Sequence, residues 1–338
     1  MNKNQHIDIP LVSRKSVEFF ASMFKEVDEK TYTLLRAATI PNDIHNDTDY
    51  EYLPESCLKN CLEVLAQHLE NKQLGWLFLR ACKDTFIPRM VAAISKRTTL
   101  KDALEQFGEV LRQESITANV YVENAGGTYW LVREKTGVDE AWFKYAEMFS
   151  VICMAELLRA LTDNQWRPGR IGIQSACIED FAKLPSLEYG QFFIERPVTA
   201  LEIPESLLFS PTQLPLYLDN KTAHTTKTSL DNLSFKEQFT FAIAPYLSMG
   251  KLPIKLAAEI LRMNVRTLQR KLSAENIVYK QFIEKLVFEN IARHLRCSDE
   301  SITSIASRFS YSDAAHFSRS FKRIYQLTPS DYRKKFNR

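Results

Sequence analysis

The sequence lacks the segments that direct a chain into a membrane or out of the cell, and it lacks common catalytic motifs. No apolar run reaches the length of a membrane helix, and the N-terminal residues lack the apolar block of a signal peptide. A cytoplasmic protein without a membrane partner is therefore expected. The first 232 residues contain no phosphate-binding loop, no GxSxG and no HExxH, so the sequence does not predict an enzyme.

Paired cysteine spacings are also missing. The six cysteines are scattered along the chain, and none forms the CxxC pairs typical of a zinc site. We interpret them as small buried hydrophobic side chains in preference to metal or redox residues, and we expect no cofactor. They are Cys57, Cys61, Cys82, Cys153, Cys177 and Cys297.

The chain has little net charge, but its charged residues are unevenly distributed. The formal net charge is +3. Residues 233–338 contain 19 Lys and Arg against 9 Asp and Glu, a net charge of +10, whereas the preceding residues contain 25 against 32, a net charge of −7. A basic domain joined to an acidic one is typical of a nucleic-acid binder with a second, different domain.

Residues 302–336 predict a helix, a tight turn, a second helix and a short third helix. Apolar residues recur on one face of each main helix, and Ser312 is a suitable N-cap for the second. The expected core positions are Ile305, Ala306, Phe309, Phe317, Phe321 and Ile324. The opposite face of the second helix is basic and rich in small residues, as close approach to a DNA major groove requires.

The same pattern occurs a second time in the chain. Without a gap, a shift of 49 residues aligns six positions of residues 305–321 with Leu256, Ala257, Ile260, Leu268, Arg270 and Leu272. Two helix-turn-helix units are therefore predicted, at about residues 252–273 and about residues 302–323. Residues 279–296 predict one helix between them, about 27 Å long at about 1.5 Å per residue.

This C-terminal region resembles the DNA-binding domain of the AraC/XylS family of bacterial transcription regulators. The resemblance rests on LAAEILRMNVRTLQRKL (256–272), on Ser312-Asp313, His316-Phe317-Ser318-Arg319 and Phe321-Lys322, and on Thr328-Pro329-Ser330-Asp331-Tyr332-Arg333. One departure is Ser310, where the family usually carries glycine. Serine in a left-handed conformation there would cost about 1 kcal/mol relative to glycine.

The resemblance implies which residues contact DNA. In the first unit these are Arg266, Thr267, Gln269 and Arg270, and in the second Ala314, Ala315, His316, Arg319, Lys322 and Arg323. Arg and Gln can each form paired hydrogen bonds to base edges in the major groove. Lys322 and Arg323 are interpreted as phosphate contacts or solvated charges, and packing beside the turn is the alternative for His316.

The first part of the chain predicts an α+β domain. Amphipathic helices are expected over residues 57–69 and 99–112, with Thr98 or Thr99 as a cap, and a long helix over residues 139–161. A hairpin turns at Gly126-Gly127, and short strands follow at residues 170–175, 191–195 and 199–203. Residues 1–15 are expected to be loosely ordered and residues 41–54 to form a loop.

This part is similar to the arabinose-binding/dimerisation type of N-terminal domain. The similarity is carried by Thr99-Leu100-Lys101-Asp102-Ala103-Leu104, Trp166-Arg167-Pro168, and Glu195-Arg196-Pro197-Val198 before Leu207-Leu208-Phe209. An effector cavity would draw on aromatic residues that serve equally well as core, and the effector itself cannot be read from the sequence. The candidates are Phe78, Trp130, Trp142, Tyr145 and Phe149.

The expected organisation is thus an α+β effector or dimerisation domain followed by an all-α domain of two helix-turn-helix units joined by a helix. The boundaries are residues 1–209, a linker at 210–232, and residues 233–338. The resemblance implies a homodimeric transcription regulator that binds promoter DNA and is controlled by a small effector or by dimerisation. It favours an activator that contacts RNA polymerase, while the sequence does not decide between activator and repressor. The alternatives are an enzyme domain fused to a DNA-binding module, or an architectural DNA-binding protein without an effector.

Overall fold

The structure, a computed structural model, describes residues 7–46, 50–94, 98–212, 233–249 and 252–336. These residues divide into two compact units. The N-terminal unit comprises the described residues of 10–47 and 57–232, and the C-terminal unit those of 1–9, 48–56 and 233–338. No pattern in the sequence predicts that residues 7–9 and 50–56 belong to the C-terminal unit. Most of the expected linker, from residue 213 on, lies outside the described residues.

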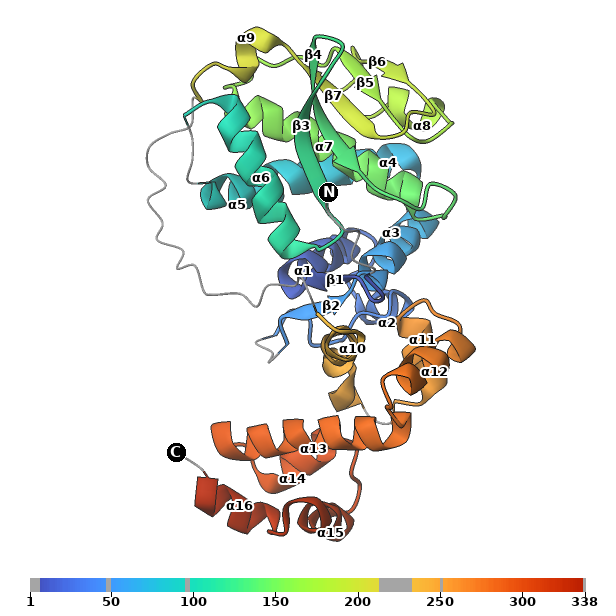
Figure 1. Ribbon diagram of the computed structural model, residues 1–338, viewed down its shortest axis with the longest axis vertical. Coiled ribbons are helices and arrows are strands. Elements are labelled where there is room, and N and C mark those ends of the chain that lie inside the picture. Colours follow the sequence, from blue (N-terminus) through green and yellow to red (C-terminus); the bar gives the residue numbers. More distant parts are fainter. Residues whose placement is uncertain (1–6, 47–49, 95–97, 213–232, 250–251, 337–338) are drawn as a thin grey trace. The chain divides into compact units, whose positions relative to one another are not determined.

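Short helices and a five-stranded sheet make up the N-terminal part of the chain (Figure 1). The helical segments are α1 (Arg14–Ser22), η1 (Met23–Glu26), α2 (Tyr32–Ala37), α3 (Ser56–His68), α4 (Asn71–Ala81), η2 (Cys82–Phe86), α5 (Ile87–Ala93), α6 (Leu100–Glu114), α7 (Phe143–Leu161), α8 (Glu179–Ala182) and α9 (Glu205–Leu208). The expected cap of α6 is confirmed, because Thr99 Oγ1 accepts a hydrogen bond from the Asp102 backbone N–H at 3.2 Å.

The sheet follows the order β3-β4-β7-β5-β6, in which only the β5–β6 pair is parallel. Its strands are β3 (Asn119–Ala125), β4 (Thr128–Glu134), β5 (Arg170–Gly172), β6 (Gln191–Phe193) and β7 (Thr199–Ile203). The predicted hairpin is confirmed. Gly126 and Gly127 both have positive φ, +61° and +80°, as a two-residue turn between twisted strands requires.

Helix α7 covers one face of this sheet. Leu131, Ile171 and Leu201 are fully buried on that face, one from each of three neighbouring strands. A fully buried carboxylate, Glu147, ties the helix to the strand ends by accepting hydrogen bonds from the Gln174 backbone N–H at 2.7 Å and from neighbouring hydroxyl groups. A buried charge satisfied in this way fixes the position of the helix on the sheet.

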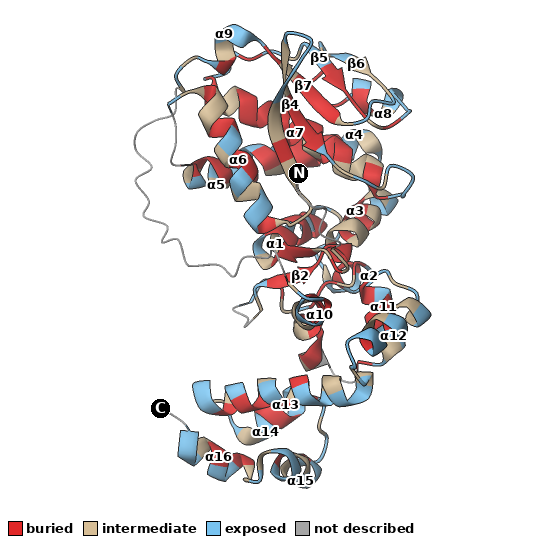
Figure 2. Ribbon diagram, in the orientation of Figure 1, coloured by how far each residue is buried: buried red, intermediate tan, exposed pale blue. Residues whose placement is uncertain are grey.

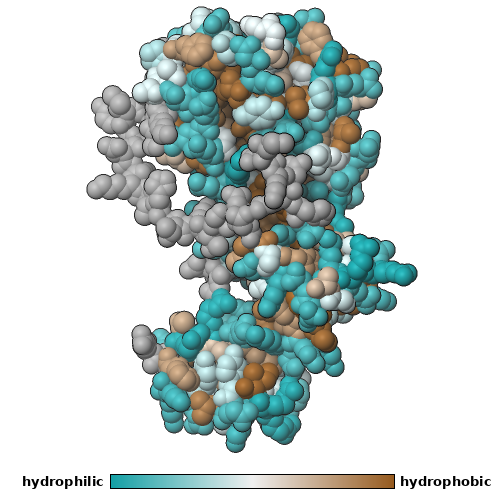
Figure 3. All heavy atoms as spheres, in the orientation of Figure 1, coloured by the Kyte–Doolittle hydropathy of each residue, from teal (hydrophilic) through white to brown (hydrophobic). Residues whose placement is uncertain are grey.

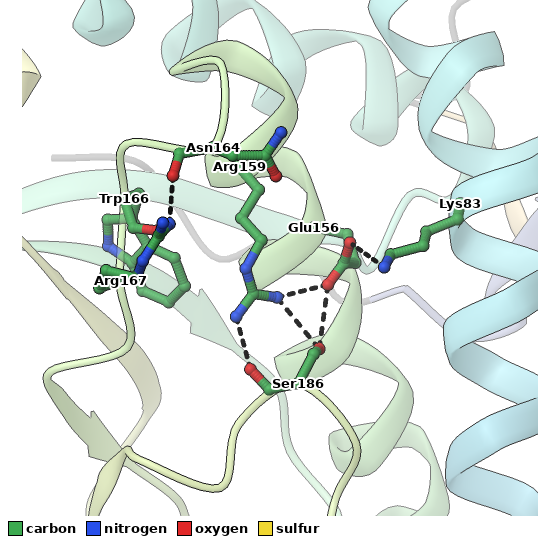
Figure 4. A network of polar contacts seen from close by, with 7 residues as sticks. All are labelled: Lys83, Glu156, Arg159, Asn164, Trp166, Arg167 and Ser186. Atoms are coloured by element: carbon green, nitrogen blue, oxygen red, sulfur yellow. Dashed lines mark hydrogen bonds and ion pairs between the residues drawn. The ribbon is translucent and has the colours of Figure 1, made fainter.

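A second polar network lies at the other end of α7 (Figure 4). Glu156 accepts hydrogen bonds from Arg159 and from the Ser186 hydroxyl, and Lys83 Nζ lies 3.6 Å from its other oxygen. Arg159 also donates to the Ser186 carbonyl oxygen, so it holds a residue whose φ of +68° is unusual for serine. The network therefore fixes the loop after α8 against α7.

Two segments that we expected to be irregular contain short, fully buried strands. These are β1 (Leu11–Ser13) in the N-terminal unit and β2 (Tyr52–Pro54) in the C-terminal unit. Three residues are too few for a periodic pattern to distinguish a strand from a loop. The expectation of loose order at residues 11–13 and of a loop at residues 52–54 was wrong.

The rest of the C-terminal unit is helical, so the predicted α+β and all-α division is confirmed. Its elements are α10 (Phe235–Ile243), η3 (Ala244–Met249), α11 (Ile254–Ile260), α12 (Val265–Ala274), α13 (Tyr279–Cys297), α14 (Ile302–Arg308), α15 (Ala314–Tyr325) and α16 (Pro329–Phe336). In the part of the chain that the structure describes, no helix is long and apolar enough to cross a membrane.

Candidate nucleic-acid interface

The first helix-turn-helix unit consists of α11, a turn and α12. Asn264 caps α12 as predicted, since its side-chain oxygen accepts a hydrogen bond from the Arg266 backbone N–H at 2.8 Å. Leu268 and Leu272 are buried on one side of α12. The residues expected to contact DNA lie away from this core: Arg266, Gln269 and Arg270 are exposed and Thr267 is half-buried. Figure 3 shows hydrophilic side chains over this helix pair.

The second unit consists of α14, a turn and α15. Phe317 and Phe321 are fully buried, as predicted, but Ile324 is 38% exposed and does not complete their face. Tyr325 and Leu327 pack against the core at the end of α15 instead. All the residues of α15 expected to contact DNA are exposed: Ala314, Ala315, His316, Arg319, Lys322 and Arg323.

The cap of α15 is the residue after the one expected. Asp313, not Ser312, accepts a hydrogen bond from the Ala315 backbone N–H at 2.8 Å. Both residue types are good caps, so the sequence alone did not separate them. The difference matters for the interface because Asp313 places a negative charge at the start of the exposed α15 face.

The turns of the two units differ by one residue. After each first helix one residue has a left-handed backbone, Arg262 with φ +48° and Ser310 with φ +62°, and these residues are 48 positions apart. The N-caps Asn264 and Asp313 are 49 positions apart. The second turn therefore contains one residue more than the first.

Because of this extra residue, the predicted gapless alignment of the two units is wrong for their first helices. The second helices correspond at an offset of 49, as predicted, but the first helices correspond at 48. The smaller offset pairs the buried residues Ala257, Ala258 and Leu261 with Ile305, Ala306 and Phe309. It also explains why Leu256, which we expected in the core, is 39% exposed.

Three basic side chains of α15 and α16 have partners within the domain, two of them acidic side chains and one a backbone carbonyl oxygen. Arg319 lies 4.0 Å from Asp313, and both side chains are more than half exposed, so solvent screens this pair strongly. Arg323 is hydrogen-bonded to Glu284 of α13, which holds its guanidinium beside that helix. Arg333 donates to the Glu300 carbonyl oxygen at 2.6 Å, which gives it a structural role at the start of α14.

Most of the aromatic candidates for an effector cavity lie in the core. Phe78 and Phe149 pack edge to face at 5.4 Å within a buried cluster, and Trp142 is 2% exposed. Helix α7, to which Phe149 belongs, is largely buried (Figure 2). Tyr145 is half-buried beside Lys144. Trp130 lines a pocket of about 430 Å³ on the sheet.

Two arginines that line this pocket, Arg170 and Arg196, were not among the predicted site residues. The signal that points to them is a glycine inside a strand, Gly172, which often marks a close approach of other groups to the sheet. The predicted burial of cysteines holds for Cys57, Cys61, Cys82 and Cys153, whereas Cys177 and Cys297 are exposed. Burial raises the pKa of the Cys61 thiol, so this group is unreactive.

Comparison with known proteins bears on the helix-turn-helix units. Residues 257–335 match a family model described as a helix-turn-helix domain. The C-terminal region is an AraC-type helix-turn-helix DNA-binding domain. The match runs from α11 to α16, so this DNA-binding domain includes both units and the helix between them.

Curated relatives share only this DNA-binding domain. The HTH-type transcriptional activator RhaR of Mannheimia succiniciproducens is 38% identical over 61 residues, which is 18% of this chain and 22% of that protein. The HTH-type transcriptional activator RhaS of Citrobacter koseri is 34% identical over 77 residues, 22% of this chain and 28% of that protein. The chain thus covers less than a third of the length of either relative.

A solved structure spans the whole chain at low similarity. The transcriptional regulator CdpR from Pseudomonas aeruginosa aligns over 98% of this chain and 100% of its own, with 16% identity and a TM-score of 0.34. A similarity this low carries no argument about function. The N-terminal unit has therefore to be interpreted from its own residues.

Proposed function

We infer that this protein is a sequence-specific transcription regulator that reads DNA with α12 and α15. The observation that carries this proposal is that two capped helices of an AraC-type domain expose polar residues at corresponding positions. Arg270 and Arg319 are 49 residues apart, as are the N-caps of their helices, and both are exposed. Corresponding exposed arginines are what two successive major-groove contacts require.

The spacing helix supports simultaneous binding of both units. Helix α13 has 19 residues, which at about 1.5 Å per residue gives roughly 28 Å. Successive major grooves on one side of DNA lie about 34 Å apart. We propose that a single chain covers about two turns of DNA, with the net charge of +10 over residues 233–338 attracting the phosphate backbone.

The two units are proposed to read bases in different ways. Arg266, Gln269 and Arg270 are long side chains suited to paired hydrogen bonds with guanine or adenine. Helix α15 begins instead with Ala314 and Ala315, whose small size allows its backbone close to the groove. His316 and Arg319 then supply hydrogen bonds, and Lys322 contacts a phosphate.

The N-terminal unit is proposed to control this DNA binding. By its position in the chain and its separate core, it is suited to binding a small effector, to forming a homodimer, or to both. The printed names of both relatives describe transcriptional activators. Activation through contact with RNA polymerase at promoter DNA is therefore the proposed mode of action, in a protein that is not an enzyme.

Alanine variants of the two arginines test the assignment of the reading helices. Arg270→Ala and Arg319→Ala should each weaken binding to the specific site by about 1–3 kcal/mol and relax sequence preference over one half of it. Lys335→Ala is the matched control, because Lys335 is an exposed cation of α16 outside both reading helices. It should weaken binding to all sequences equally and lower the salt slope by about one unit.

The measurement is the affinity of each variant for the selected site and for scrambled DNA at several salt concentrations. Equal losses on both DNAs for the Arg270 and Arg319 variants would show that these residues are phosphate contacts. In that case the proposed reading faces are wrong, although the domain still binds DNA. A wild-type chain that binds no DNA sequence selectively would contradict the proposed function itself.

A further inference from the structure

The face of the five-stranded sheet opposite α7 carries a pocket of about 430 Å³. Side chains alternate between the two faces of a strand, so Trp130 and Val132 lie on the opposite face from Leu131. Arg133, on the same face as Leu131, has its guanidinium 5.8 Å from the ring of Phe143 in α7. The pocket therefore belongs to the face that α7 does not cover.

Small residues make the floor of the pocket. One row of paired residues crosses four strands in the order Val132, Ala200, Gly172 and Phe193. The two central members have at most a methyl group, between a branched side chain and an aromatic one. A volume of about 430 Å³ falls in the range of roughly 300–1,000 Å³ that is typical of small-molecule sites.

The next row supplies a fixed aromatic wall. Arg170 donates to Glu202 through Nε at 2.8 Å and through Nη2 at 2.9 Å, and its guanidinium lies 5.3 Å from the centre of the Trp130 ring. Hydrogen bonds from Arg170 hold the pKa of Glu202 below its usual range. The charge of Arg170 is thus balanced by Glu202, and the pair holds Trp130 in place.

Arg196 lies at the other side of the pocket, and its charge is not balanced as that of Arg170 is. Its guanidinium carbon lies 5.6 Å from the centre of the Phe193 ring. No carboxylate of the described residues forms an ion pair with it. A Cβ on Gly172 would lie 3.4 Å from its Cγ, in ordinary van der Waals contact, so the Arg196 side chain lies over the sheet at Gly172.

We propose that this pocket binds a small monocarboxylate with an apolar body, the carboxylate at Arg196 and the body over Gly172 and Ala200. The aromatic rings of Trp130 and Phe193 supply apolar walls, and an arginine beside an apolar floor recognises a carboxylate by paired hydrogen bonds. Glu123, exposed at the far rim of the pocket, disfavours a second negative charge. This inference rests on the proposed function, since it names the chemical class of the effector.

Matched probes separate the charge from the apolar body of the ligand. The probes are 2-naphthoate and octanoate, each compared with its uncharged amide, and binding to the full chain is measured by calorimetry. Each carboxylate should bind at least about tenfold more tightly than its amide, because a hydrogen bond to a charged group contributes about 1.5–3 kcal/mol.

Two variants, Arg196→Gln and Gly172→Ala, locate the site, and a third, Arg36→Gln, is the control. Arg196→Gln should reduce the affinity for both carboxylates to that of the amides, whereas Arg36→Gln, which changes an exposed arginine of α2, should leave it unchanged. Gly172→Ala should weaken carboxylates and amides alike by placing a methyl group on the floor. Thermal unfolding of each variant shows whether it folds.

The proposal is overturned if neither carboxylate binds the wild-type chain, or if the Arg196 and Arg36 variants bind it equally. Either result leaves DNA binding untouched, because the assay detects the ligand without DNA and Arg196 lies outside the helix-turn-helix domain. Conversely, a chain that binds these carboxylates but no specific DNA would contradict the proposed function and leave the ligand site intact.

Discussion

The two helix-turn-helix units share a plan but differ in how their cores are completed. The second unit packs entirely on neighbouring helices: residues of α13, α14, α15 and α16 form one buried cluster that includes Phe288, Phe317 and Tyr332. This cluster is rich in aromatic residues and local in sequence. All its members among the described residues, including the partly buried ones, lie within residues 287–332.

The first unit depends on residues from far away in the chain. The Ser56 hydroxyl donates a hydrogen bond to the Ile260 carbonyl oxygen at the end of α11. Helix α10 holds further segments of the same unit, since the rings of Tyr52 and Phe241 pack edge to face at 5.8 Å. The helix-turn-helix fold thus occurs twice in the sequence. In the second copy its core is completed by neighbouring helices, and in the first copy by segments that are distant in the sequence.

The N-terminal segment also reaches α12 itself. The Gln238 side-chain oxygen accepts hydrogen bonds from the backbone N–H groups of Asp8 and Ile9, at 3.1 and 2.9 Å. Asp8 in turn pairs with Lys271 of α12. Of α12 and α15, the two helices proposed to read DNA, α12 is therefore the one whose surroundings include residues from the N-terminal part of the sequence.

The largest effect is expected from Phe317→Ala, which removes a fully buried ring from the second unit. Such a truncation typically costs about 3–5 kcal/mol. Because the buried cluster of the second unit is local, amide protons of α14 and α15 should exchange faster while those of α12 keep their protection. Hydrogen exchange followed by mass spectrometry resolves the two units.

Tyr52→Ala is the counterpart for the first unit, since Tyr52 is 3% exposed and contacts Phe241. It should lower the free energy of opening of α10 and α12 by a smaller amount, roughly 2–4 kcal/mol, so that their amide protons exchange faster. Exchange in α15 should stay unchanged. If both variants loosen both units equally, the two units fold as one body, and the contrast drawn between them does not hold.

The sequence was informative wherever a pattern is long or local. Helices α6, α12 and α13 and the hairpin at Gly126 were predicted because caps, turn glycines and periodic apolar residues all lie within a few turns. The offset of 48 between the first helices was missed, because Leu256 and Ala257 both fit an apolar pattern. Only packing shows which of them is buried.

The surroundings of the first helix-turn-helix unit, the short strands and the pocket could not be predicted, because they depend on contacts between residues that are not neighbours in the sequence. Nothing near Ser56 indicates that its hydroxyl bonds to Ile260, and three-residue strands carry no periodicity. The pocket is likewise assembled from four strands, so Gly172 and Arg196 meet only after the sheet has formed. The DNA-contacting residues remain predictions from resemblance, supported by their exposure.

A smaller effect should distinguish the two caps. Asp313→Ala and Asn264→Ala each remove a hydrogen bond to a backbone N–H and should cost about 1 kcal/mol of stability. Asp313→Asn keeps the cap and removes only the charge beside Arg319. It should change the stability by less than about 0.5 kcal/mol. It should also tighten binding to all DNA a few-fold, because Arg319 is freed from the ion pair and the repulsion between the Asp313 carboxylate and the DNA phosphates is removed.

Denaturant unfolding measures the stability of each variant, and binding to scrambled DNA measures its sequence-independent affinity. Asn264→Ala is the control in which a cap is lost without any change of charge. Asp313→Asn binding DNA more weakly than the wild type would indicate that the carboxylate orients Arg319 for DNA, and the proposed penalty from its charge would then be wrong.

The smallest effect concerns the left-handed residue that both turns share. Ser310 has φ +62°, a conformation that costs a serine up to about 1 kcal/mol more than a glycine. Ser310→Gly should therefore stabilise the second unit by a few tenths to about 1 kcal/mol, part of the gain being offset by the greater freedom of glycine in the unfolded chain.

Ser307→Gly is the matched control, because Ser307 is an exposed residue inside α14 and its replacement should cost about 0.5–1 kcal/mol. Chemical denaturation of the two variants gives opposite signs if the turn is strained. Loss of stability in both would mean that the Ser310 side chain makes contacts that outweigh the strain, and the two turns would then differ in more than their length.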